Sequence, residues 1–336
     1  MELTKHILYL ALYTASLANP SRAGSVPGLF EALNKAGASQ FAVQLQNDAS
    51  ILDLFVSGDI GTVFAPQDAD DLPRYMTRQQ ANATGQQDLE YQLFKRLHEW
   101  REITDDQDLT SVDNSTNLNG KNQTVVIKPR SNNTTSRPTP KLRRYGEPEP
   151  PFSFAQISTG LGDISNIIQK DIEFSRCGSN GIIHIIDKYF TVPVNLSETA
   201  TALPELSTFA SLIGCPCLKQ ELDWKPSITV FIPSNEAFAS AGVTGKSTSD
   251  TASRVKGLVV PDFVGYSPDL VNGMRLTTLN GSRLTVGVDE DGGNLWVGGA
   301  RVIKSDIILF NGVAHIIDKV GSFLPYLIMG DCSSLT

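Results

Sequence analysis

Apolar residues along the chain follow helical spacing in its first part. Leu29, Phe30, Leu33 and Ala36 recur at positions i, i+1, i+4 and i+7, which places them on one face of a helix, and Gly37 follows as a stop signal. Other short segments with apolar faces predict further helices, at 40–45, 51–56 and 203–212.

Strand signals follow the helical segments. Two apolar runs, at 62–65 and 228–232, each end at a proline, which cannot donate a hydrogen bond to a neighbouring strand. In the last third of the chain, apolar and polar residues alternate between turn signals such as Asn280-Gly281, the pattern of antiparallel hairpins. The strands predicted there are 275–279, 283–288, 295–297, 301–303, 306–310 and 312–318. Because strands follow helices without alternating with them, the pattern predicts the α+β class.

The chain also repeats itself in three segments that keep their order. The pairs are Ser-Gln-Phe-Ala (39–42) with Ser-Thr-Phe-Ala (207–210), Thr-Val-Phe-Ala-Pro (62–66) with Thr-Val-Phe-Ile-Pro (229–233), and Asn-Gly-Ile-Ile-His-Ile-Ile-Asp (180–187) with Asn-Gly-Val-Ala-His-Ile-Ile-Asp (311–318). Repeats this far apart indicate a duplicated domain and exclude the short periods of solenoids and propellers.

The two copies differ in length. The spacing from Thr62 to Asn180 is 118 residues, whereas the spacing from Thr229 to Asn311 is 82, so the first copy is 36 residues longer. The excess falls where the composition turns polar and rich in Asn, Thr, Pro and Arg, at about 101–150. We therefore expect this insertion to be a disordered or glycosylated excursion.

These repeated segments resemble the two signatures of the fasciclin (FAS1) family. The first signature is similar to residues 62–68 and 229–235, and the second to residues 180–187 and 311–318. The resemblance implies two FAS1 domains, at about 25–193 and 194–327, each a twisted antiparallel β-wedge or sandwich flanked by helices. A Tyr-His pair that the family tends to carry in mid-domain is matched only in part, by Leu97-His98 and by Tyr266-Ser267.

The ends of the chain indicate secretion. Residues 1–18 have the pattern of a signal peptide, with Lys5 and His6 ahead of an apolar run that is too short to span a bilayer. No other run reaches the length of a span, and residues 328–336 form a polar tail. We expect a secreted protein, extracellular or in the cell wall. The net charge of −8 argues against nucleic acid or an anionic membrane as a partner.

Glycosylation sequons agree with secretion and cluster in the insertion. The candidate sites are Asn82, Asn114, Asn122, Asn132, Asn133, Asn195 and Asn280.

Four cysteines, an even number in an oxidising compartment, are disulfide candidates: Cys177, Cys215, Cys217 and Cys332. Cys215 and Cys217 are too close in sequence to pair without strain, so we expect each to pair with one of the other two. Which pairs with which stays open.

Two histidines are the first candidates for catalysis. His184 and His315 each lie in an apolar strand, three residues before Asp187 and Asp318 respectively. Strand residues at i and i+3 point to opposite faces, so these acids cannot orient the rings. We expect buried, structural histidines that bond backbone groups. The chain also has too few histidines for a copper cluster. We expect no cofactor, no metal and no catalytic role.

The resemblance also marks two Asp-Ile pairs, Asp171-Ile172 and Asp306-Ile307, as candidates for partner binding. In animal members of the family, residues around such a pair are implicated in contact with cell-surface receptors. The alternative is that Ile packs in the core while Asp caps a turn.

The family resemblance implies an adhesion, binding or scaffolding module whose partner is an extracellular protein or a cell-wall glycan. An alternative comes from residues 260–268, which look like the secreted FAS1 proteins of filamentous fungi. Some of those serve beside secreted laccases in the oxidative coupling of aromatic polyketides into dimeric pigments or toxins. In that case the chain would be an auxiliary, non-oxidase subunit that orients two radicals, with Trp224, Tyr266 and Trp296 as stacking surfaces.

Overall fold

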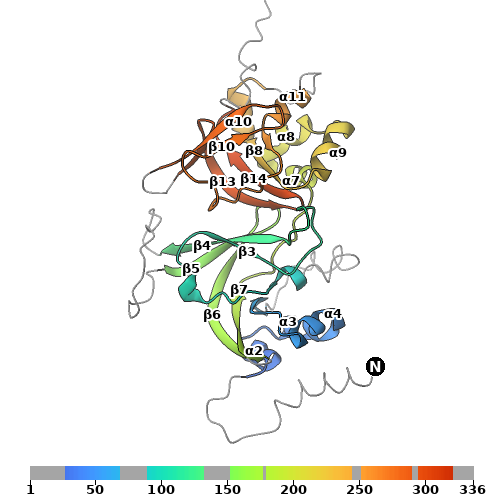
Figure 1. Cartoon of the computed structure of the whole chain (residues 1–336), viewed down its shortest axis with the longest axis vertical. Coiled ribbons are helices and arrows are strands. Elements are labelled where there is room, and N and C mark those ends of the chain that lie inside the picture. Colours follow the sequence, from blue (N-terminus) through green and yellow to red (C-terminus); the bar gives the residue numbers. More distant parts are fainter. Residues whose placement is uncertain are drawn as a thin grey trace, which may run out of the picture.

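The computed structural model describes residues 27–68, 89–131, 152–176, 179–243, 251–289 and 294–320. They form two stacked domains, each with one seven-stranded sheet and its helices (Figure 1). We refer to the described residues up to 193 as domain 1 and to those from 194 on as domain 2. The predicted α+β class is confirmed. The expected signal peptide and polar tail lie outside the described residues.

Domain 1 begins with helices where the apolar spacing predicted them. They are α2 (Leu29–Lys35), α3 (Ser39–Asn47) and α4 (Ala49–Val56). Each helix buries its apolar face, with Leu33, Phe41 and Ile51 fully covered. The carboxylate of Asp48 caps α4 by accepting hydrogen bonds from the backbone N–H groups of Ser50 and Ile51.

The sheet of domain 1 has the strand order β2-β1-β7-β6-β5-β4-β3. Its strands are β1 (Thr62–Pro66), β2 (Leu93–Phe94), β3 (Gln107–Thr110), β4 (Thr124–Ser131), β5 (Phe152–Ser158), β6 (Ile164–Arg176) and β7 (Ser179–Ile186), with the 3-10 helix η1 (Trp100–Glu102) between β2 and β3. The strands are antiparallel except for β1 and β7, which pair in parallel. The two repeated signatures of the sequence are therefore hydrogen-bonded neighbours inside the sheet, next to its edge strand β2.

Domain 2 has the same plan. Its elements are α7 (Leu196–Ala202), η2 (Pro204–Leu206), α8 (Ser207–Leu212), α9 (Pro216–Trp224), β8 (Ile228–Pro233), α10 (Asn235–Ser240), α11 (Thr251–Lys256), β9 (Val259–Val260), β10 (Arg275–Thr277), β11 (Arg283–Val288), β12 (Leu295–Val297), β13 (Ala300–Leu309) and β14 (Gly312–Ile317). The order β10-β11-β12-β13-β14-β8-β9 reproduces domain 1 strand for strand, with β8 and β14 parallel. The two strands predicted at 301–303 and 306–310 are one strand, β13, whose pairing with β14 shifts register between them.

The expectation of a disordered excursion at 101–150 is wrong for residues 101–131, because β3 and β4 lie there and belong to the sheet. Val125 and Ile127 are fully buried, and this short apolar run was hidden by the polar residues around it. Part of the extra length of domain 1 is the connection between β3 and β4, residues 111–123, whose counterpart in domain 2 is only 278–282. Residues 132–151 lie outside the described part.

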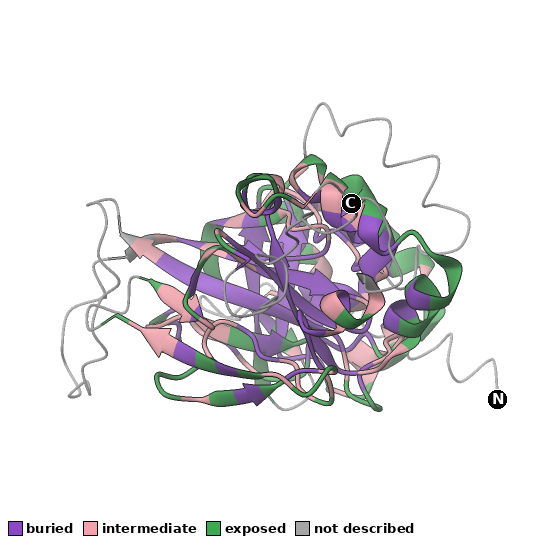
Figure 2. Ribbon diagram, turned by 90° about the horizontal axis from the view of Figure 1, so that it is seen from above, coloured by how far each residue is buried: buried purple, intermediate pink, exposed green. Residues whose placement is uncertain are grey.

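Burial follows the strands. Figure 2 shows buried residues along the central strands of both sheets, while the helices are buried on one face and exposed on the other. Within the described residues, no helix is long and apolar enough to cross a membrane.

Candidate functional site

The histidine of domain 1 is held in a closed hydrogen-bond network on β7, inside the sheet. His184, on β7, is fully buried and stacks on Phe64 of β1 with 5.3 Å between ring centroids. Its Nε2 lies 2.8 Å from the carbonyl oxygen of His98, and its Nδ1 lies 3.4 Å from the backbone nitrogen of Asp171. Because the carbonyl only accepts and the backbone N–H only donates, Nε2 carries the proton and Nδ1 accepts.

Domain 2 repeats this network. His315, on β14, is fully buried and stacks on Phe231 with 5.4 Å between centroids. Its Nε2 lies 2.9 Å from the carbonyl oxygen of Gly265, and its Nδ1 lies 3.4 Å from the backbone nitrogen of Asp306. Both rings use both nitrogens on the backbone, so neither has a free nitrogen with which to act as a base.

Burial sets the charge of these rings. It lowers the pKa of His184 and of His315, and it lowers the pKa of the adjacent His98 to about 4, with the positive charge of Arg96 adding to the effect. All three imidazoles are therefore neutral at pH 7.

The acids three residues after the histidines do not contact the rings. Asp187 accepts hydrogen bonds from the backbone and side-chain N–H groups of Asn166, at 2.8 and 2.6 Å. Asp318 accepts one from the backbone N–H of Arg301 at 2.8 Å. Each acid thus ties the end of its strand to the neighbouring strand.

A loop with the same hydrogen bonds in both domains shows which residues of the two domains correspond. The hydroxyl of Thr62 donates to the carbonyl of Arg96 and accepts from the N–H of His98. In domain 2, the hydroxyl of Thr229 donates to the carbonyl of Phe263 and accepts from the N–H of Gly265. The two loops therefore align with His98 opposite Gly265.

This alignment corrects the expected match of Leu97-His98 with Tyr266-Ser267. Because His98 aligns with Gly265, the counterpart of Tyr266-Ser267 is Glu99-Trp100. The hydrogen bonds agree, because the N–H of Trp100 donates to Asp171 and the N–H of Ser267 donates to Asp306.

The two Asp-Ile pairs have the same backbone conformation and different surroundings. Asp171 and Asp306 both adopt the left-handed region, with φ of 53° and 62°, which Asp tolerates better than most residues. Asp171 is exposed and Ile172 is half-buried. Asp306 and Ile307 are fully buried. An external partner has no access to this second pair in the folded chain.

Domain 1 covers Asp306. The ammonium nitrogen of Lys128, on β4, lies 2.5 Å from Asp306 Oδ2 and donates to the hydroxyl of Ser305 at 2.6 Å. The side chains of Lys128 and Asp306 are 11% and 0% exposed. Burial alone would raise the pKa of Asp306, but the charge of Lys128, acting together with the hydrogen bonds from Lys128 and Ser267, lowers the pKa to about 2. The pair is therefore an ion pair buried between the two domains.

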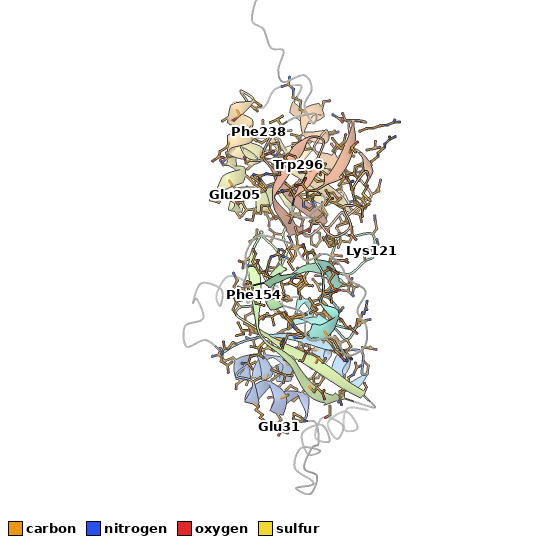
Figure 3. The ribbon with its side chains drawn as sticks, turned by 90° about the vertical axis from the view of Figure 1, so that its left-hand side faces the viewer. Glu31, Lys121, Phe154, Glu205, Phe238 and Trp296 are labelled. Carbon is orange, nitrogen blue, oxygen red and sulfur yellow. The ribbon has the colours of Figure 1, made fainter. Side chains whose placement is uncertain are left out.

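An apolar cluster and a loop add to the ion pair of Lys128 and Asp306. We call this interface between the two domains the joint. Val126 of domain 1 packs against Tyr266, Ile308 and Val313 of domain 2. The connection 111–123, which we call the clamp loop, lies against domain 2, and Figure 3 places its Lys121 at the boundary.

The clamp loop bonds domain 2 through polar side chains and backbone. The contacts are Asn117 Nδ2 to Trp224 O (2.8 Å), Asn117 N to Phe310 O (3.1 Å), Ser227 N to Asn117 O (3.3 Å), Asn119 Nδ2 to Ser227 Oγ (3.0 Å) and Gln123 Nε2 to Leu309 O (3.1 Å). Sequence reasoning missed this joint. Lys128 directly follows the apolar run 125–127, but that position alone does not indicate a partner 178 residues away.

The remaining candidates are modification sites. Cys215 and Cys217 are exposed, while Cys177 and Cys332 lie outside the described residues, so the disulfides stay a prediction. The exposed sequon residues are Asn114 and Asn280, the half-buried ones are Asn122 and Asn195, and Asn82, Asn132 and Asn133 lie outside. Among the described residues, no group of three or more acidic, His or Cys side chains could hold a metal ion.

A comparison with protein-family models finds a match in the second half of the chain. Residues 204–321 match the model of the Fasciclin domain. Domain 2 is a fasciclin domain. The resemblance found in the repeated signatures is thereby confirmed, and domain 1 shares its strand order and its histidine network.

Relatives of the chain come from fungi and animals. It is 34% identical over 172 residues to "Fasciclin-like arabinogalactan protein CTB11" of Cercospora beticola, covering 50% of this chain and 44% of the relative. It is 32% identical over 162 residues to "Fasciclin-like arabinogalactan protein elcF" of Phaeosphaeria nodorum, covering 48% and 50%. It is 27% identical to human periostin over 44% of this chain and 18% of that protein. The matches thus span about half the length of the fungal relatives.

A solved FAS1 domain pair from the insect cell adhesion molecule fasciclin I is similar over 85% of this chain and 97% of that chain, at 18% identity and a TM-score of 0.39.

Proposed function

We propose that the chain is a secreted, glycosylated, non-catalytic protein that acts as a binding or scaffolding module at the cell wall or in the extracellular matrix. The observation that carries the proposal is the joint. A buried ion pair, an apolar cluster and the clamp loop hold two FAS1 units in one orientation. The pair can then present its outer faces as a single rigid surface. The backbone bonds of the two histidines support a structural role for these residues.

The candidate contact on this surface is the exposed pair Asp171-Ile172. Asp171 Oδ1 accepts from the N–H of Trp100, which orients the carboxylate while leaving it exposed. Asp306-Ile307 is excluded from this role by its burial behind Lys128. We propose an extracellular protein or a wall glycan as the partner. The description of the fungal relatives as fasciclin-like arabinogalactan proteins supports a place in the wall.

The laccase alternative depends on aromatic stacking surfaces. Of its three candidates, Trp224 is 65% exposed, Trp296 is half-buried and Tyr266 is buried in the joint. Orienting two aromatic radicals needs two open faces near each other, and only Trp224 offers one, so the exposures favour the scaffolding proposal over the alternative.

Fractionation and gene deletion test the two proposals together. The full chain with a C-terminal tag, expressed in a filamentous fungus, is expected in the medium and the wall fraction, with the leader removed. Retention inside the cell would contradict the scaffolding role. Deletion of the gene in its own host is expected to weaken wall cohesion and leave aromatic dimers unchanged. A change in the yield or regiochemistry of such dimers would instead support the laccase alternative.

A further inference from the structure

Two exposed features lie on either side of the joint. On domain 1, the sequon residue Asn114 lies on the clamp loop and is exposed, and its side chain makes no hydrogen bond to any described residue. On domain 2, Trp224 ends α9 and is 65% exposed, the only aromatic side chain among the large exposed apolar residues of the described part. An indole so open to water is unusual, because burial of its large surface is favourable.

The clamp loop brings these two features together. Asn117 Nδ2 donates to the backbone carbonyl of Trp224 at 2.8 Å, so the loop touches the end of α9. Asn114 is three residues before Asn117, which limits the distance between their Cα atoms to about 11 Å even in a fully extended chain. Asn114 therefore lies close to the point where the clamp loop meets the end of α9.

The asparagine of the other sequon in the clamp loop, Asn122, already uses its side chain in hydrogen bonds. Asn122 is half-buried, and its Nδ2 donates to the carbonyl oxygens of Ser111 at 3.0 Å and Val112 at 3.1 Å. A glycan replaces one of the two Nδ2 hydrogens and would remove one of these bonds. The following residue, Gln123, is buried and bonds domain 2, so Asn122 adjoins a buried part of the joint.

We propose that Asn114 carries an N-linked glycan whose first sugars stack on Trp224, so that the glycan bridges the two domains, while Asn122 stays unmodified. Attachment forms a bond between Nδ2 and the sugar C1, breaks the bond from C1 to the lipid diphosphate of the donor, and releases one Nδ2 proton. The C–H face of a pyranose ring complements the electron-rich face of an indole. The inference rests on the secretion proposed above.

Glycopeptide mass spectrometry of the secreted full chain tests the modification. The expected result is a glycan on Asn114 and none on Asn122. Secreted protein that carries glycans elsewhere and none on Asn114 overturns the inference and leaves the proposed function standing. Protein that is neither secreted nor glycosylated contradicts both.

Tryptophan fluorescence tests the stacking. Enzymatic removal of N-glycans from the folded protein is expected to raise iodide quenching of Trp224 about twofold, because a stacked sugar covers one of the two faces of the ring. The Trp224→Phe variant should show no such change, since Trp100 is buried and Trp296 is half-buried with its Nε1 bonded to Asp289. Asn114→Gln should match the deglycosylated protein. Equal quenching with and without the glycan overturns the bridge.

Discussion

Domain 1 and domain 2 build the same turn and use it differently. Asp171 and Asp306 have the same left-handed backbone, and each N–H donates to the buried histidine of its own domain. In domain 1 the carboxylate faces water, whereas in domain 2 it is paired with Lys128 of the other domain. The repeat therefore determines the local conformation, while the neighbouring domain determines whether that conformation is a surface or an interface.

The largest effect should come from breaking the ion pair on one side. Asp306→Asn keeps the size and the tolerance of a left-handed backbone but leaves the buried ammonium of Lys128 without its counter-charge. The expected loss in the free energy of unfolding is about 3–5 kcal/mol, the usual cost of orphaning a buried charge. Chemical denaturation of the full chain measures it. Asp171→Asn, the matched change in domain 1, should cost less than about 1 kcal/mol, because the bond from Trp100 can be kept.

A double variant separates charge burial from loss of shape. Lys128→Met combined with Asp306→Asn removes both charges, and it should recover most of the stability lost in Asp306→Asn alone. If the double variant is as unstable as the single one, the carboxylate matters through its bonds to Ser267 and not through Lys128.

Acid should weaken domain 1 before domain 2. Each buried histidine has a pKa below its unfolded value of about 6.5, so the unfolded state binds more protons as the pH falls below that value, and stability is lost. Domain 1 has two such rings, His98 and His184, whereas Gly265 stands in place of His98 in domain 2. With a folded pKa of about 4, His98 alone should cost about 2 kcal/mol between pH 7 and pH 5. Hydrogen exchange resolved by domain measures the difference.

His98→Phe is the control for that comparison. It keeps an aromatic ring beside Phe94, where the centroids are now 6.2 Å apart, and it leaves the backbone bonds of residue 98 in place. The acid sensitivity of domain 1 should then approach that of domain 2. The ion pair of the joint should not respond in this range, because the stability that comes from the depressed pKa of Asp306, about 2, is lost only as the pH falls below about 4.

The sequence predicted what depends on local pattern and repetition. The helices at 29–56, the proline-terminated strands and the hairpin at Asn280-Gly281 all follow from spacing and turn chemistry, and the structure has them. The duplication also placed the two histidines in equivalent strands. The sequence did not predict the joint, because its contacts join residues that are distant in sequence. Lys128 and Asp306 are 178 residues apart, and no local pattern distinguishes a lysine that enters a joint from one that ends a strand.

A smaller loss is expected from the clamp loop. Gln123→Ala removes the bond to the carbonyl of Leu309 and the acceptor of the Thr124 N–H, both buried. The expected cost is about 1–2 kcal/mol, the penalty for buried polar groups that lose their partners. Gln107→Ala is the matched control, because Gln107 is half-buried and bonds only within domain 1, at 3.5 Å. Equal costs for the two variants would show that the clamp loop adds nothing to the joint.

The smallest effect on stability, and the sharpest on function, should come from the exposed turn. Asp171→Asn removes one surface charge and can keep the bond from the Trp100 N–H, so the unfolding free energy should change by less than about 1 kcal/mol. If Asp171-Ile172 is the partner contact, loss of the charge should still lower retention of the secreted protein in the wall fraction. Asp187→Asn is the control, since Asp187 is also an exposed acid of domain 1, directly after the end of β7, and is bonded to Asn166. Equal retention of the Asp171 variant and the parent chain would show that this turn is not the partner contact. Of the two Asp-Ile turns, only the one at Asp306 would then have an assigned contact, its ion pair with Lys128.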